Sequence, residues 1–169
     1  MHPLVKLAKE TIDLYVREGK IREVREDELS ADLKQRAGVF VCLKIRGVLR
    51  GCIGTFQPQE PTIAHETVRN AISAATCDPR FPCLRADELD NIEYTIDVLT
   101  APEPVKDKTE LDPARYGVIV QAGGKRGLLL PDIEGVDTAD YQIRIAMQKA
   151  GILPGAVVEL SRFEVKRFR

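Results

Sequence analysis

The spacing of apolar and polar residues predicts three amphipathic helices. Apolar side chains recur at intervals of three and four residues in three stretches of the chain, which places them on one face of a helix. Gly19 and Gly151 are typical stop signals after two of these stretches. We therefore expect helices over Pro3 to Glu18, over Pro61 to about Cys77, and up to about Ala150 after a cap at Asp137 or Thr138.

Strict alternation of apolar and polar residues predicts strands between these helices. Gly123-Gly124 punctuates one pair of alternating runs, which is a hairpin signal, and Pro102 and Pro104 end an earlier strand. The expected strands are Val39 to Ile45, a partner starting at Val48, Asn91 to Thr100, Tyr116 to Gln121, Gly127 to Leu130, and Val157 to Phe163 or beyond. Hairpins with intervening helices indicate an α+β fold with a mostly antiparallel sheet flanked by helices.

The first hairpin makes a testable prediction about two cysteines. A two-residue turn at Arg46-Gly47 places Ile45 opposite Val48, so that paired residue numbers sum to 93. In that register Cys52 lies opposite Val41, and Cys42 and Cys52 are not expected to bond. A three-residue loop would instead bring the two cysteines face to face.

Length and charge narrow the class of protein. The chain of 169 residues suits a single domain over residues 1–169 and is long enough to bury a hydrophobic core. Its 25 basic and 26 acidic residues give a net charge of -1, which opposes nonspecific binding to nucleic acid or to anionic lipid. No apolar run approaches a membrane span of about 20 residues, and Met1 to Lys6 lacks the features of a signal peptide. We expect a cytoplasmic protein.

The four cysteines are expected to be free thiols. A reducing compartment disfavours disulfides, and none of the cysteine spacings is the Cys-x-x-Cys of a structural zinc site. The two histidines add few further ligands, so the sequence predicts neither a metal nor a cofactor.

Two short motifs resemble a known family. Leu49-Arg50-Gly51-Cys52-Ile53-Gly54-Thr55 and, downstream, Asp78-Pro79-Arg80-Phe81-Pro82 are similar to the signature of the AMMECR family, and the similarity runs over nearly the whole chain. The resemblance implies an α+β fold with a smaller lobe beside the main sheet. In prokaryotes it also implies a place in the AmmeMemoRadiSam set, with a Memo-like protein and a radical SAM enzyme as partners.

Cys52 is the candidate catalytic nucleophile. A thiol reacts as the thiolate, whose formation a nearby cation such as Arg50 favours. Gly51 and Gly54, which lack a Cβ, leave its flanks open to a ligand or to a packing partner, and Thr55 completes the motif. The competing interpretation is that Cys52 is a small buried side chain beneath the second helix, because free cysteine is among the most buried residues.

Arg80 and His65 are the other candidates. The prolines beside Arg80 restrict the backbone, and a guanidinium held in this way suits a carboxylate or phosphate. Arg80 could equally pair with Asp78 and fix the corner between helix and loop, and both roles are compatible. His65, near the start of the second helix, could serve as a base for Cys52 or be an exposed helix residue.

Three functions remain open from the sequence. The first is a cleft built around Arg50, Cys52 and Arg80 that binds a small anionic or carbonyl-bearing ligand, with Cys52 as nucleophile in a modification pathway. The second is a noncatalytic adaptor that presents the same surface to a protein. RNA binding is a third class, which the balanced charge and the lack of tryptophan oppose. The ligand-binding candidates are Arg50, Gly51, Gly54, Thr55, His65 and Arg80.

Overall fold

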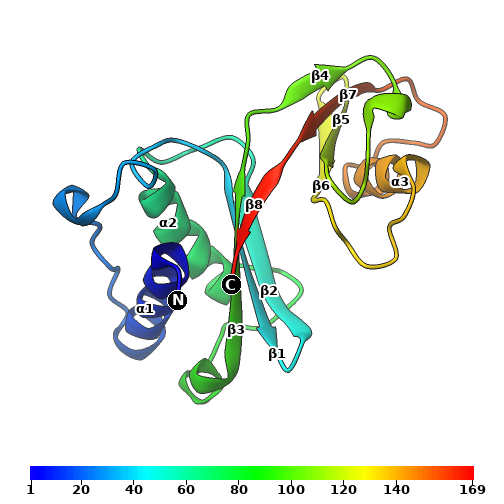
Figure 1. Cartoon of the computed structure of the whole chain (residues 1–169). Coiled ribbons are helices and arrows are strands. Elements are labelled where there is room, and N and C mark those ends of the chain that lie inside the picture. The colour runs from blue at the N-terminus through cyan, green and yellow to red at the C-terminus, as the bar shows by residue number, and fades with distance from the viewer. The chain divides into compact units, whose positions relative to one another are not determined.

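The computed structural model describes residues 1–169, except for the side chain of Glu28. The chain forms two compact units, and each is described by itself (Figure 1). Unit 1 comprises Met1–Leu99 and Lys166–Arg169, and unit 2 comprises Thr100–Val165. The presence of a smaller second lobe agrees with the expectation from the family, whereas the single domain over residues 1–169 stays a prediction.

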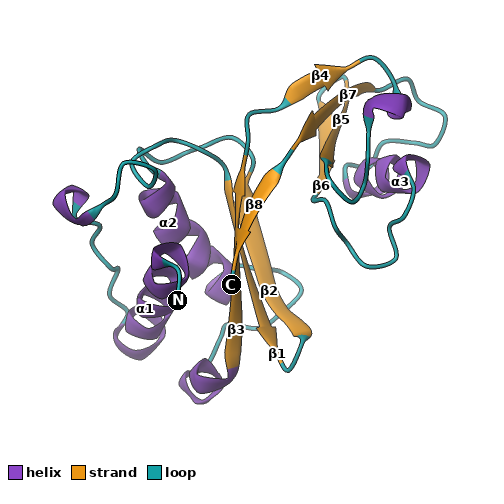
Figure 2. Ribbon diagram, in the orientation of Figure 1, coloured by secondary structure: helices purple, strands orange, loops and turns teal.

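Unit 1 is a four-stranded sheet with two helices on one face (Figure 2). The strand order is β2-β1-β3-β8, and β1 is antiparallel to both of its neighbours. Alternate residues of β1 and β3, such as Val41 and Ile96, are fully buried in the core shared with the helices. The elements are α1 (Pro3–Glu18), β1 (Val39–Ile45), β2 (Val48–Thr55), α2 (Ile63–Thr76), β3 (Ile92–Leu99) and β8 (Val165–Phe168), with short 3-10 turns at η1 (Glu26–Glu28) and η2 (Ala86–Asn91).

Unit 2 is a second four-stranded sheet packed against one helix. The strand order is β4-β7-β5-β6, and the pairs β4–β7, β7–β5 and β5–β6 are antiparallel. Its own core contains Val118, Val120, Ala146 and Met147. The elements are β4 (Glu103–Val105), η3 (Lys108–Glu110), β5 (Gly117–Ala122), β6 (Lys125–Leu129), α3 (Ala139–Lys149) and β7 (Glu159–Phe163). The predicted α+β class with antiparallel pairing is therefore confirmed.

Helix ends follow local hydrogen bonds that the sequence partly reveals. The predicted bounds of α1 are confirmed, because Gly19 adopts a φ of 67° and returns its N–H to the carbonyl of Tyr15. Thr138, one of the two predicted caps, accepts from the amide of Tyr141 at the start of α3. The start of α2 was wrong by two residues, because the hydroxyl of Thr62 caps the helix by accepting from the amide of His65.

The strand β4 was not predicted from the sequence, and β7 and β8 were predicted as one strand. Glu103–Val105 is an edge strand despite Pro104, and an edge position tolerates proline because one side of the strand needs no donor. The run predicted from Val157 is divided between β7 and β8, which belong to different sheets. In unit 1, β8 is fixed by Arg167, whose guanidinium donates twice to the buried carboxylate of Asp97 at 2.8 Å.

No helix in the part of the chain that the structure describes is both long enough and apolar enough to cross a membrane.

Gly51 permits the closest approach between β2 and α2. An added Cβ at this position would lie 2.2 Å from the backbone carbonyl oxygen of Ala74, which cannot move aside as a flexible side chain would. We expect Gly51→Ala to lower the free energy of unfolding by about 1–3 kcal/mol, the usual range for overpacking. Urea denaturation followed by circular dichroism measures the effect.

Gly124→Ala is the matched control, because a Cβ there meets no atom within 4 Å. We expect that variant to unfold at nearly the urea concentration of the parent protein. Equal stability of the two variants would contradict the close packing of β2 on α2.

Candidate functional site

A β-bulge at Arg50 sets the register of the cysteine motif. The two-residue turn at Arg46-Gly47 is confirmed, with φ values of 51° and 75° and with Ile45 paired to Val48. Between Leu43 and Lys44 the register shifts by one residue, so that Leu43 pairs with Gly51. Arg50 is then the extra residue on β2, and every pair beyond it differs from the prediction.

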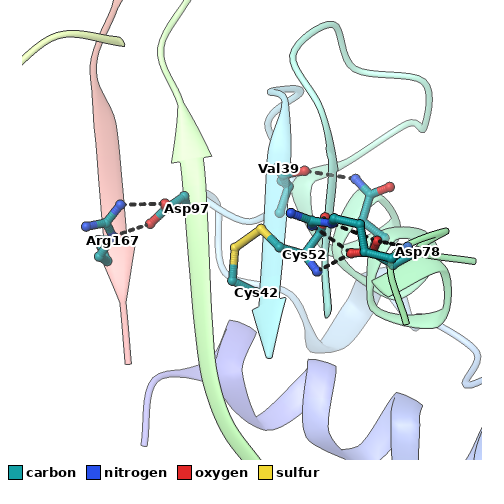
Figure 3. Close-up of a disulfide and its surroundings, with 8 residues drawn as sticks. Val39, Cys42, Cys52, Asp78, Asp97 and Arg167 are labelled. Atoms are coloured by element: carbon teal, nitrogen blue, oxygen red, sulfur yellow. Dashed lines mark hydrogen bonds and ion pairs between the residues drawn. A yellow bond between two sulfur atoms is a disulfide. The ribbon is translucent and has the colours of Figure 1, made fainter. Parts of the chain in front are cut away.

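The bulge brings Cys42 and Cys52 together. Their Cα atoms are 4.1 Å apart as a cross-strand pair, and the two sulfur atoms form a disulfide (Figure 3). The prediction that these two cysteines do not bond was therefore wrong, because it assumed a regular ladder beyond the turn. The expectation of four free thiols was also wrong for this pair, whereas Cys77 and Cys83 are free and exposed.

Arg50 links the bulge to the segment after α2. Its guanidinium donates to both carboxylate oxygens of Glu88, at 2.7 and 2.9 Å, and to the carbonyls of Pro82 and Cys83. The side chain is only 14% exposed, and its hydrogen bonds hold the pKa of Glu88 below the usual value. The positive charge of Arg50 is therefore balanced by the carboxylate of Glu88 within the protein.

Asp78 and Arg80 hold the backbone of Cys52. The amide of Cys52 donates to Oδ2 of Asp78 at 2.9 Å, and its carbonyl accepts from Nη2 of Arg80 at 3.3 Å. β2 lies at the edge of its sheet, so these side chains satisfy groups that a further strand would otherwise pair. We call this pair of contacts the Asp78–Arg80 clamp; Figure 3 shows Asp78 beside Cys52.

The clamp is itself a close ion pair. Arg80 donates to Asp78 from Nε at 3.0 Å, from Nη2 at 2.8 Å and from its backbone amide at 3.1 Å. The side chain of Asp78 is 2% exposed, and hydrogen bonds from Arg80 hold the pKa of that carboxyl far below its usual value. The internal pairing considered for Arg80 is confirmed.

One side of the Arg80 guanidinium still faces solvent. The side chain is 55% exposed, and within the described part of the chain no hydrogen bond engages its Nη1. The ring of Phe81 lies 5.5 Å from the guanidinium carbon and restricts it further. A guanidinium that its other contacts already orient can bind a carboxylate or phosphate with little additional loss of entropy.

Thr55 ends the motif in a buried polar network. Its hydroxyl donates to the carboxylate of Glu66, which is fully buried in α2. The same hydroxyl accepts from the side-chain Nδ2 of Asn70. Glu66 also accepts from the backbone amides of Gln59 and Glu60, both at 2.8 Å. Thr55 is thus occupied in joining the end of β2 to α2.

The two glycines and His65 have partners of their own. Gly51 faces the carbonyl of Ala74, and the ring of Phe40 covers Gly54. The space beside Gly51 and Gly54 is therefore filled by packing partners, which is one of the two uses that the sequence allows for these glycines. His65 places Nδ1 2.8 Å from the hydroxyl of Thr62, and none of its described hydrogen bonds reaches Cys52.

The cysteine motif is also held by residues that the sequence did not single out as site candidates. Cys42, Glu66, Asn70 and Glu88 all hold parts of the motif. Glu88 also accepts from the backbone amide of Arg85 at 2.9 Å, but Arg85 is not a residue type that signals a cap in the sequence. Among the described residues, no three His, Cys, Asp or Glu side chains are grouped so as to hold a metal ion.

Comparison with known proteins identifies relatives over the whole chain. A Thermotoga maritima protein is 55% identical over 170 residues, which cover 99% of this chain and 98% of that protein. A Clostridium acetobutylicum protein, CA_C1420, is 45% identical over 168 residues, and there the chain spans only 36% of the relative's length.

A solved structure has the same fold. The crystal structure of the uncharacterized protein PH0010 from Pyrococcus horikoshii matches with a TM-score of 0.89 at 32% sequence identity. The match covers 97% of this chain and 88% of that one. The family model AMMECR1 matches residues 5–169, a range that contains both sequence motifs and the clamp between them. The chain therefore belongs to the AMMECR1 family.

Proposed function

We propose that Cys52, in its reduced form, is the nucleophile of a cytoplasmic modification pathway and acts on a small anionic or carbonyl-bearing ligand bound at Arg80. A Memo-like protein and a radical SAM enzyme are the proposed partners. Radical initiation belongs to the radical SAM partner, because the chain has no cysteine spacing typical of an iron-sulfur cluster.

The observation that carries this proposal is the Asp78–Arg80 clamp. It fixes the amide and the carbonyl of Cys52 together, and the Arg80 side chain beside the same residue is 55% exposed. The proposed nucleophile and the proposed anion-binding group are thereby held next to each other. Such orientation before binding is what accelerates reactions between bound groups.

The chemistry requires the free thiol. External thiols supply two electrons and two protons, which breaks the bond between Cys42 and Cys52 and leaves two thiols. After Cys52 loses its proton, the thiolate attacks the ligand's carbonyl carbon and forms a carbon–sulfur bond. The carbonyl electron pair moves to oxygen, which takes a proton from solvent.

A noncatalytic adaptor is the second candidate. Arg50 is paired with Glu88, and Arg80 is paired with Asp78, so a carboxylate already balances each cation near Cys52. Balanced cations favour thiolate formation less than free ones do. In this alternative the clamp maintains a surface for a partner protein and Cys52 is structural.

Thiol reactivity separates the two candidates. The test protein carries Cys42→Ser, Cys77→Ser and Cys83→Ser, so that Cys52 is its one sulfhydryl among the cysteines of the sequence. If Cys52 is the nucleophile, its rate of labelling by iodoacetamide should rise with pH about a midpoint well below about 8.5, the ordinary thiol pKa. Intact-mass measurement of the labelled fraction gives the rate.

Arg80→Gln in the same background tests the role of the cation. The midpoint should rise in this variant, and inorganic phosphate, used as the anionic probe, should slow labelling in the parent but not in the variant. Slow labelling with an ordinary midpoint in both proteins supports the adaptor and excludes the nucleophile.

Removal of the Asp78 charge should weaken the clamp. Asp78→Asn leaves the amide of Cys52 and the guanidinium of Arg80 with a neutral partner, and we expect a loss of about 1–3 kcal/mol in the free energy of unfolding at neutral pH. The folded pKa of Asp78 is depressed, so its contribution is complete above the unfolded value of about 3.9 and is lost as pH falls below it. The stability gap between parent and variant should therefore narrow in acid.

Asp87→Asn is the matched control. Asp87 pairs with Arg85 at the same two-residue spacing as Asp78 and Arg80, but both of its groups are mostly exposed. Exposed pairs contribute little, so urea denaturation at several pH values should show a much smaller gap for this variant. A gap at Asp78 that does not change with pH would contradict the clamp as an ionic contact.

A further inference from the structure

We propose that Cys42 is the resolving thiol of Cys52, and that the pair exchanges reversibly with small aliphatic thiols of the glutathione class. The inference deepens the proposed function and rests on its thiol role for Cys52. It assigns a second sulfur to the site and names the class of molecule that releases the nucleophile.

The two sulfurs stay opposite one another whether or not they are bonded. The amide of Cys52 points outward to Asp78, so Cys42 and Cys52 form a non-hydrogen-bonded pair, the type in which opposite Cα atoms are closest. Cys42 lies on the inner strand β1 and pairs with Thr95 of β3 on its other side. Each cysteine is thus held by contacts that do not involve the disulfide.

The disulfide is one of several contacts that close this hairpin. It joins residues only ten positions apart, and the turn and ladder between β1 and β2 bring the same strands together. Polar contacts to Asp78 and Arg80 also fix the outer strand. Reduction is therefore expected to leave the fold intact, and this is a requirement for a disulfide that opens and closes in use.

Both cysteines can be reached by a small reagent. Val41 and Leu43, which flank Cys42 along β1, are fully buried against the helices, and alternation places Cys42 on the opposite face of the sheet. Cys42 and Cys52 are each partly exposed there.

The position of the strands assigns the two roles. Cys52 belongs to the edge strand β2 and Cys42 to an inner strand, so an incoming thiolate reaches the sulfur of Cys52 first. Its attack forms a mixed disulfide on Cys52 and expels the thiolate of Cys42, which takes a proton. A second small thiol then forms a disulfide with the first one and leaves Cys52 reduced. In the reverse direction Cys42 attacks the mixed disulfide and releases the small thiol.

The test uses a Cys77→Ser, Cys83→Ser protein, which retains the pair alone. In buffers of reduced and oxidised glutathione at millimolar concentration, alkylation and intact mass should show one reversible two-electron equilibrium, with no change in the far-ultraviolet circular dichroism. Adding Cys42→Ser should make a single glutathione adduct accumulate on Cys52. Adding Cys52→Ser instead should give Cys42 an adduct several-fold more slowly.

Three results would overturn the inference. These are a disulfide that glutathione reduces only once urea unfolds the chain, a reduction that itself unfolds the chain, and equal rates of adduct formation on the two cysteines. The proposed function fails separately: reversible exchange combined with an ordinary labelling midpoint for Cys52 leaves the resolving pair standing and removes the nucleophile.

Discussion

The buried carboxylate of Asp78 is the contact on which the arrangement of unit 1's edge depends. It takes hydrogen bonds from the strand that carries Cys52 and from the guanidinium of Arg80, and Arg80 returns a bond to the same strand. A carboxylate without such donors could not be buried at acceptable cost. The two family motifs are therefore two halves of one ionic and hydrogen-bonded structure, although they lie more than twenty residues apart in the sequence.

Carboxylates balance both of the arginines near Cys52. Arg50 and Arg80, which the sequence brings to attention as cations near a thiol, each have a carboxylate partner, and their first task is to fix backbone. Arg80 nevertheless keeps one face in solvent, whereas Arg50 does not. The two arginines are therefore unequal candidates for the proposed anion binding, and Arg80 is the more exposed of the two.

The sequence predicts what depends on local pattern and misses what depends on one irregular residue. Periodicity locates α1 and the β1–β2 turn correctly, because Gly19, Arg46 and Gly47 have local conformational preferences. It fails beyond Arg50, because a bulge is stabilised by Glu88 and by carbonyls more than thirty positions away. No local pattern in the heptapeptide reports those partners. The pairing of Cys42 with Cys52 follows from that bulge, so a prediction that misses the bulge also misses the pairing.

The path of the chain between β3 and β8 has an evolutionary consequence. These two strands are neighbours in one sheet, yet nearly all of unit 2 lies between them in the sequence. Where the chain leaves and returns, Thr100 and Glu164 are joined by two hydrogen bonds of 2.9 Å. Unit 2 is therefore inserted at the connection between two neighbouring strands, so that a change in its length during evolution need not alter the order of strands in the parental sheet.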